Sequence, residues 1–150
     1  MNKVKLNLPE YHFSIRTNNN KAYILDILRK KYVVLTPEEW VRQHIIAYLI
    51  EHKNYPAGRM VVEYEFNYHT LTKRSDLVVF NSKGIVLMVV ECKAPNVPIT
   101  QKTFEQILQY NHIFHASYIL VSNGIENYCC NINSSDSYNF LPEVPDYAML

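Results

Sequence analysis

The chain of 150 residues is 48% hydrophobic and 19% charged, and it contains only 3 glycines. These proportions are typical of globular proteins and exclude a disordered, collagen-like or low-complexity chain. Because a chain of this length can bury one sizeable core, we predict a single domain over residues 1–150. We divide it into an N-terminal extension (1–35), a core (36–132) and a C-terminal tail (133–150).

The formal net charge is +1, so no strong overall field attracts nucleic acid or an anionic membrane. Contact with DNA would have to come from local basic groups such as Arg29-Lys30-Lys31 and Lys73-Arg74. Short basic runs of this kind are more often solvated loops.

No segment of the sequence predicts a membrane helix or a secretion signal. The longest apolar run, from Ile85 to Val90, is far shorter than the roughly 20 residues that a membrane helix needs. The first nine residues lack the apolar stretch of a signal peptide. The cysteines, of which Cys129 and Cys130 are adjacent, form no disulfide or zinc pattern. We therefore expect a reduced, cytoplasmic protein without a membrane partner.

The first 35 residues contain short alternating pieces and a turn at Asn18-Asn19-Asn20. A helix is then predicted to begin at Thr36-Pro37-Glu38-Glu39, because a capping hydroxyl precedes a proline at the first helical position. In this interpretation Glu39 supplies the capping-box carboxylate. The helix runs to about residue 53.

Apolar residues recur at helical spacing on one face of this predicted helix. At 100° per residue, Glu38 falls on the same inward face, where an unpaired carboxylate would cost several kcal/mol. Glu38 is therefore expected to have a partner. The other residues of the predicted inward face are Val41, Ile45, Tyr48, Leu49 and His52.

The remaining elements are predicted as strands over 60–68, 75–80 and 85–92, a helix over 101–115, and strands over 118–122 and 126–132. The strand over 85–92 is apolar on both faces and belongs in the middle of a covered sheet. The predicted fold class is α/β (α+β), with a mixed central sheet of about four to six strands flanked by helices. The core order is α-β-β-β-α-β-β, and the tail is expected to wrap the surface.

The segment Val90-Glu91-Cys92-Lys93 ends a hydrophobic strand with a carboxylate and an ammonium two positions apart, on one face. Asp76 lies on the preceding strand of the same hairpin. An even hairpin loop would pair Phe80 with Ile85 and place Glu91 diagonally from Asp76, within roughly 7 Å. An odd loop would place Asp76 on the opposite face unless a bulge restores the phase.

Two carboxylates this close repel each other unless a cation lies between them, and oxygen ligands suit Mg²⁺ or Mn²⁺. Lys93 beside them could orient or deprotonate a water, or neutralise charge on a phosphate oxygen. Asp76, Glu91 and Lys93 are thus the minimum set for metal-assisted phosphodiester hydrolysis. The alternative is a salt-bridged cluster at the end of a sheet.

Asp76 followed by Glu91-Cys92-Lys93 resembles the signature of the PD-(D/E)XK nuclease superfamily. Glu38 matches the acidic residue that many members carry on the first helix, and Gln106 with Tyr110 matches their QxxxY motif. The surrounding sequence resembles stand-alone bacterial proteins related to the N-terminal nuclease domain of type I restriction enzyme R subunits (HsdR). The segments that carry this resemblance are 35–43, 90–95 and 100–104.

This resemblance implies a restriction-endonuclease-like fold and a Mg²⁺- or Mn²⁺-dependent endonuclease that hydrolyses DNA. The implied metal ligands are Asp76, Glu91, Glu38 and the backbone carbonyl of Cys92. Lys93 would serve the attacking water, and Gln106 and Tyr110 would line the site and hold the substrate. The implied partners are DNA and restriction-modification or helicase proteins.

The sequence departs from the family pattern in two respects. Ser75 replaces the proline of the family name, a change outside the ligand set. R subunits also need a helicase motor and methylase partners, and 150 residues contain neither. The alternative function is therefore a catalytically silent nucleic-acid-binding or regulatory module with a nuclease fold. RNA as substrate, the cleavage specificity and the oligomeric state stay open.

Overall fold

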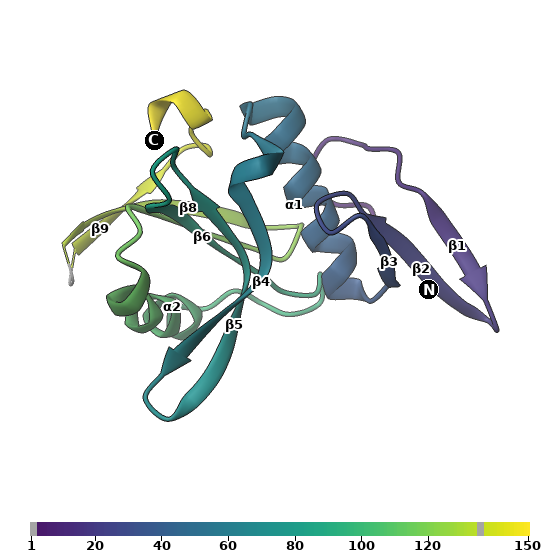
Figure 1. Cartoon of the computed structure of the whole chain (residues 1–150), viewed down its shortest axis with the longest axis horizontal. Helices are drawn as coiled ribbons and strands as arrows, with labels where there is room; N and C mark the ends of the chain where they lie inside the picture. Colours follow the sequence, from purple (N-terminus) through teal and green to yellow (C-terminus); the bar gives the residue numbers. More distant parts are fainter. Residues whose placement is uncertain (1–2, 135–136) are drawn as a thin grey trace.

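The computed structural model describes residues 3–134 and 137–150, which form two sheets and two α-helices. Helix α1 (Pro37–Lys53) lies beside the small N-terminal sheet, and α2 (Gln101–Phe114) packs on the larger sheet (Figure 1). The small antiparallel sheet contains β1 (Ile15–Asn18), β2 (Lys21–Asp26) and β3 (Lys31–Val34). Two short 3₁₀ helices complete the described elements, Ala57–Arg59 and Tyr147–Met149.

The larger sheet has six strands in the order β4-β5-β6-β7-β8-β9. Strands β6 and β7 are parallel, joined through α2, and the other neighbours are antiparallel. The predicted mixed α+β class is confirmed, as is the order α-β-β-β-α-β-β over residues 37–134. The strands are β4 (Met60–Tyr68), β5 (Leu71–Phe80), β6 (Val86–Cys92), β7 (Tyr118–Ser122), β8 (Asn127–Ser134) and β9 (Ser137–Leu141).

Two ends of the chain differ from the prediction. The N-terminal extension forms a sheet, whose first hairpin turns at the predicted asparagines: Asn19 and Asn20 both have positive φ, 49° and 61°. Such a pair of angles gives the turn whose twist suits a two-residue hairpin. The C-terminal tail does not merely wrap the surface, because β9 pairs with β8 and extends the large sheet.

The two faces of the large sheet bury separate apolar clusters. Leu120 and Cys129 belong to the cluster that contains Val41 and Ile45 of α1. Their sequence neighbours on β7 and β8 belong to the other cluster, with Phe104 and Ile107 of α2. Alternate residues of a strand point to opposite faces, so α1 and α2 cover opposite faces of the sheet. The central strands are therefore apolar on both sides, as predicted for 85–92.

Helix α1 begins as predicted, but its capping box is incomplete. The Thr36 hydroxyl accepts a hydrogen bond from the Glu39 backbone N–H at 3.0 Å, and Pro37 is the first helical residue. The Glu39 carboxylate instead accepts hydrogen bonds from Arg29 and Arg42. The predicted return bond to Thr36 is wrong, because two guanidinium groups are stronger partners for a carboxylate than one backbone N–H.

Most of α1 between Glu39 and Leu49 is buried, so the helix has no single inward stripe. Val41, Ile45 and Leu49 are buried as predicted, whereas His52 and Glu38 are exposed. The prediction that Glu38 points inward is wrong. Apolar residues of the small sheet, among them Ile24, join the cluster around α1, and this covering was invisible to the helical periodicity.

Candidate active site

The register of β5 and β6 brings the two predicted carboxylates together. Leu77 pairs with Val90, so continuing the ladder by one residue places Asp76 opposite Glu91. The predicted pairing of Phe80 with Ile85 is wrong, because Phe80 pairs with Val86 across five loop residues. A register shift between Val79 and Phe80 returns Asp76 and Glu91 to the same face of the sheet, as a bulge does after an odd loop.

Asp76 is contacted at both carboxylate oxygens. Oδ2 accepts a 2.7 Å hydrogen bond from the backbone N–H of Cys92, and Oδ1 lies 3.4 Å from Nη1 of Arg42. Burial raises the pKa of Asp76 to about 6, and the charge of Glu38 acts in the same direction. The hydrogen bond from Cys92 and the charges of Arg42 and Lys93 lower the pKa but do not offset the burial.

Glu91 is the more perturbed of the two acids. Burial raises its pKa to about 8, and the neighbouring charge of Asp76 adds to the rise. Lys93 opposes the shift, with Nζ at 3.4 Å from Oε1 of Glu91. Keeping both carboxylates ionised at neutral pH therefore costs free energy, and a cation placed beside them would lower this cost.

These shifts predict how the stability of the metal-free protein depends on pH. The folded state holds the Glu91 proton more tightly than the unfolded state, whose glutamate has the ordinary value of 4.5. The free energy of unfolding should therefore fall as pH rises from about 4.5 to about 8. Thermal unfolding across this range measures the effect. Glu91→Gln should flatten the upper part of the curve, whereas a variant as steep as the wild type would contradict the prediction; the exposed Glu143→Gln serves as control.

Glu38 lies in the first turn of α1 and is exposed. Its negative charge raises the pKa of both Asp76 and Glu91, so its carboxylate acts on the acidic pair from the side of the helix. The buried acid of this turn is its neighbour Glu39, which is 5% exposed. The predicted site residue thus acts on the pair through its charge, from an exposed position on α1.

Gln106 and Tyr110 lie one turn apart on α2. Gln106 Nε2 donates to the Tyr110 hydroxyl at 3.2 Å, and the Tyr110 ring packs edge-on against Phe66 at 5.3 Å. Tyr110 and Glu91 line the same small cavity between α2 and the sheet. The exposed Gln106 does not line this cavity, so the structure brings Tyr110, but not Gln106, beside Glu91.

The oxygen donors present are compatible with magnesium or manganese, which accept one or two carboxylates and keep several waters. Asp76 in the middle of β5, with Glu91 and the Cys92 carbonyl at the end of β6, provides such a set. Within residues 3–134 and 137–150, no group of three or more His, Cys, Asp or Glu side chains is arranged to hold a metal ion. Glu38 therefore does not complete a three-carboxylate cluster.

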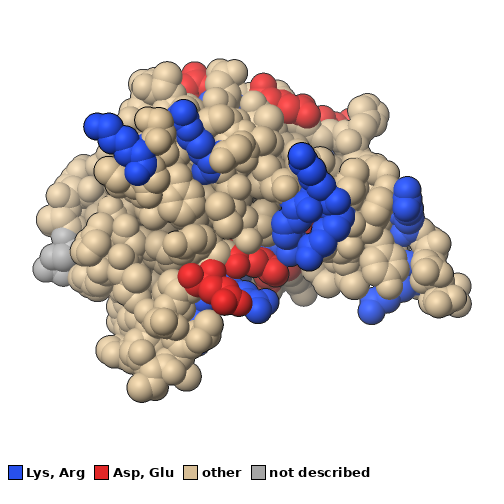
Figure 2. Space-filling model, in the orientation of Figure 1, with Lys and Arg blue, Asp and Glu red and all other residues tan. Residues whose placement is uncertain are grey.

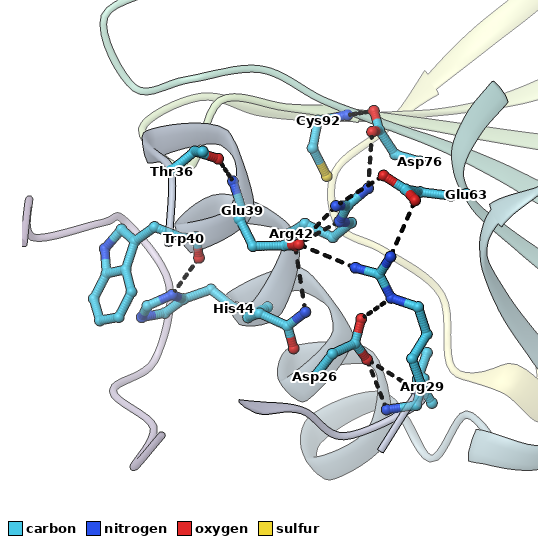
Figure 3. A network of polar contacts seen from close by, with 12 residues as sticks. Asp26, Arg29, Thr36, Glu39, Trp40, Arg42, His44, Glu63, Asp76 and Cys92 are labelled. Carbon is cyan, nitrogen blue, oxygen red and sulfur yellow. Dashed lines mark hydrogen bonds and ion pairs between the residues drawn. The ribbon is translucent and has the colours of Figure 1, made fainter. Parts of the chain in front are cut away.

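A group of charged side chains around Arg42 was missed by the sequence reasoning (Figure 3). Its ion pairs span 2.6 to 3.5 Å and come from β2, the following turn, α1, β4 and β5. Glu39 and Arg42 are three positions apart on a helix, a spacing at which opposite charges pair, so this part had a sequence signal. The Arg42 network, as it is called below, consists of Asp26, Arg29, Glu39, Arg42, Glu63 and Asp76.

On the face drawn in Figure 2, the blue groups are separated by tan and red groups and form no continuous positive surface. Arg29 forms ion pairs with Asp26, Glu39 and Glu63, so its guanidinium group is held by the protein and is not free in solvent. Arg74 pairs with Glu65 at 2.9 Å. None of the helices that the structure describes is long and apolar enough to cross a membrane.

Comparison with known proteins identifies the family. The sequence profile of the type I restriction enzyme R protein N terminus (HSDR_N) matches residues 37–145. The chain belongs to this family. The matched HSDR_N segment begins at the first residue of α1 and extends beyond β9, so it contains Asp76, Glu91, Lys93 and the QxxxY helix.

A solved structure supports the fold of this HSDR_N chain. It is a fragment of a protein assigned as the HsdR subunit of a type I restriction enzyme from Vibrio vulnificus YJ016, with a TM-score of 0.55 and 18% identity. The match covers 74% of this chain and 24% of that chain. The HSDR_N chain thus spans about a quarter of that relative. A search of the curated proteins gave no significant match.

Proposed function

We propose that the chain is a magnesium-dependent nuclease domain that hydrolyses DNA phosphodiester bonds. The supporting observation is the register of β5 and β6, in which Asp76 and Glu91 directly follow the paired residues Leu77 and Val90, with Lys93 3.4 Å from Glu91. Membership of the HSDR_N family supports the choice of nuclease chemistry and of DNA as substrate. Partners from a restriction-modification complex, or a helicase, belong to the same proposal.

In this proposal Asp76, Glu91 and the Cys92 carbonyl hold the metal, and Glu38 adds negative charge from the edge. A bound magnesium or manganese ion would supply Lewis-acid activation of the attacking water and neutralise charge on the phosphate. The water oxygen forms a bond to phosphorus as the bond from phosphorus to the leaving sugar oxygen breaks. The attacking water gives a proton to solvent, and the leaving oxygen takes up a proton from solvent.

Lys93 is placed to serve this reaction. Its side chain is 32% exposed and its ammonium faces Glu91, so it can reach both the acidic pair and a substrate at the surface. It would orient the attacking water and stabilise the negative charge that develops on the phosphate oxygens. Tyr110 and Gln106 would contact the substrate beside this position, because their hydroxyl and amide groups are hydrogen-bonding groups on the adjacent helix α2.

The test combines metal binding and cleavage. Calorimetry with Mn²⁺ should detect binding by the wild type and its loss in Glu91→Gln, with Glu143→Gln binding as the wild type does. The same proteins are then incubated with supercoiled, linear and single-stranded DNA, and with RNA, in Mg²⁺ or Mn²⁺. The proposal is supported if the wild type and Glu143→Gln cleave DNA and Glu91→Gln does not.

A different outcome would favour the second candidate, a regulatory or binding module without catalysis. The near-neutral charge of the chain supports this candidate, because it provides little general attraction for DNA. It predicts no Mn²⁺ binding, no cleavage and a stable complex with a partner protein. Cleavage of RNA but not DNA would instead correct the substrate.

A further inference from the structure

The Arg42 network connects the N-terminal sheet to Asp76 through buried charges. Its first member is Asp26 at the end of β2, which is fully buried. Asp26 Oδ2 accepts a 2.6 Å hydrogen bond from Nε of Arg29, and Oδ1 accepts bonds from the backbone N–H groups of Leu28 and Arg29. These bonds keep the pKa of Asp26 low even though burial acts to raise it. Arg29 is thereby held in one orientation.

Arg29 connects Asp26 to α1 and β4 through two further ion pairs. Its Nη2 lies 3.1 Å from Oε1 of Glu39, and its Nη1 lies 3.0 Å from Oε2 of Glu63. Glu39 in turn forms a two-pronged pair with Arg42, with Nε to Oε2 at 2.6 Å and Nη2 to Oε1 at 2.7 Å. Two parallel bonds fix the plane of a guanidinium group, so Glu39 determines where the remaining nitrogen of Arg42 points.

The remaining nitrogen, Nη1, points to Asp76 Oδ1 at 3.4 Å (Figure 3). The other oxygen of Asp76 is bound by the Cys92 N–H from β6. The backbone of Glu63, opposite Asp76, has a φ of 52° and is missing from the β4–β5 pairing, in which both its neighbours take part. A non-glycine residue in this conformation is strained, and its ion pairs with Arg29 and Arg42 can offset the strain.

We infer that Arg42 is a positioning residue that sets the orientation of the Asp76 carboxylate, and that the N-terminal sheet supports the site through it. The inference rests on the proposed function for its consequence, namely metal binding. Without Arg42, Asp76 Oδ1 would face the negative charges of Glu38 and Glu91 with no cation on the side of α1. The hydrogen bond from the Cys92 N–H would then be left to hold the carboxylate against rotation about its Cβ–Cγ bond.

A double-mutant cycle tests the contact itself and needs no metal. Thermal unfolding is measured for the wild type, Arg42→Met, Asp76→Asn and the double variant. Methionine keeps the apolar stem of arginine but not its charge. The drop in unfolding temperature caused by Arg42→Met should be clearly smaller in the Asp76→Asn background. Equal drops in both backgrounds would overturn the inference, because the two side chains would then be energetically independent.

Mn²⁺ calorimetry tests the consequence. Loss of the Arg42 charge favours a bound cation, whereas loss of the fixed Asp76 orientation opposes binding, and we expect the second effect to be larger. The Mn²⁺ dissociation constant should therefore rise about tenfold in Arg42→Met. It should not change in Lys53→Met, which breaks the ion pair to Glu143 at the other end of the same helix. If Arg42→Met does not fold, the double variant Glu39→Gln with Arg42→Met removes both partners and replaces it. A folded variant with wild-type Mn²⁺ affinity overturns the inference. A wild type that binds no Mn²⁺ refutes the proposed function instead, and the cycle alone then decides on Arg42.

Discussion

Lys93→Met should reduce the cleavage of DNA by about 10²–10³-fold while the protein stays folded. The change removes a charge that lies 3.4 Å from Glu91 and that, in the proposed function, stabilises the reacting phosphate. Losing one preorganised group that stabilises transition-state charge has an effect of this size. Single-turnover cleavage at saturating Mg²⁺ measures the chemical step.

The matched control is Lys83→Met, which removes an exposed ammonium from the hairpin loop before β6. It should cleave at the wild-type rate. Equal rates for Lys93→Met and the wild type would show that the observed cleavage has another source or that Lys93 takes no part. The Mn²⁺ affinity of Lys93→Met should be at least that of the wild type, because a positive charge has been removed beside the metal ligands.

Glu39→Ala should lower the free energy of unfolding by about 3–5 kcal/mol, the cost of removing one partner from a buried group of ion pairs. Glu39 is 5% exposed and pairs with Arg29 and Arg42, so its loss leaves two guanidinium groups facing each other. Urea denaturation followed by circular dichroism measures the difference.

The neighbouring residue provides the control. Glu38→Ala removes an exposed carboxylate from the same helical turn and should change the stability by no more than about 0.5 kcal/mol. The two substituted residues are adjacent in sequence, but the Glu39 side chain is buried and the Glu38 side chain is exposed. Similar effects of the two would contradict the described burial of Glu39. A destabilisation of Glu39→Ala below about 1 kcal/mol would show that the Arg42 network contributes little.

Local patterns sufficed for most elements of the core. The start of α1, the apolar run of β6 and the helix α2 follow from capping residues and periodicity, which act over a few residues. The motif formed by Asp76, Glu91 and Lys93 also follows from the sequence, because alternation along a strand and the hairpin connection limit where these side chains can point. The role of these residues in metal binding and catalysis stays a prediction.

Other features depended on contacts between distant segments. The alignment of Asp76 with Glu91 depends on a register shift between Val79 and Phe80. The sequence of a hairpin does not by itself predict such a shift. Helix α1 is covered on a second side by the N-terminal sheet, so Glu39 rather than Glu38 became the buried acid.

By itself, the sequence of this protein determined the α+β elements of residues 37–132, their order and the residue types of the site, since these depend on neighbours along the chain. Only the tertiary structure decided the pairing of the acids and the ion pairs that connect Asp26 to Asp76 through Arg29, Glu39 and Arg42. The physical reason is that burial and ion pairing depend on which surfaces meet in space. The periodicity of a helix or strand describes the surface of that element and does not indicate which other element packs against it.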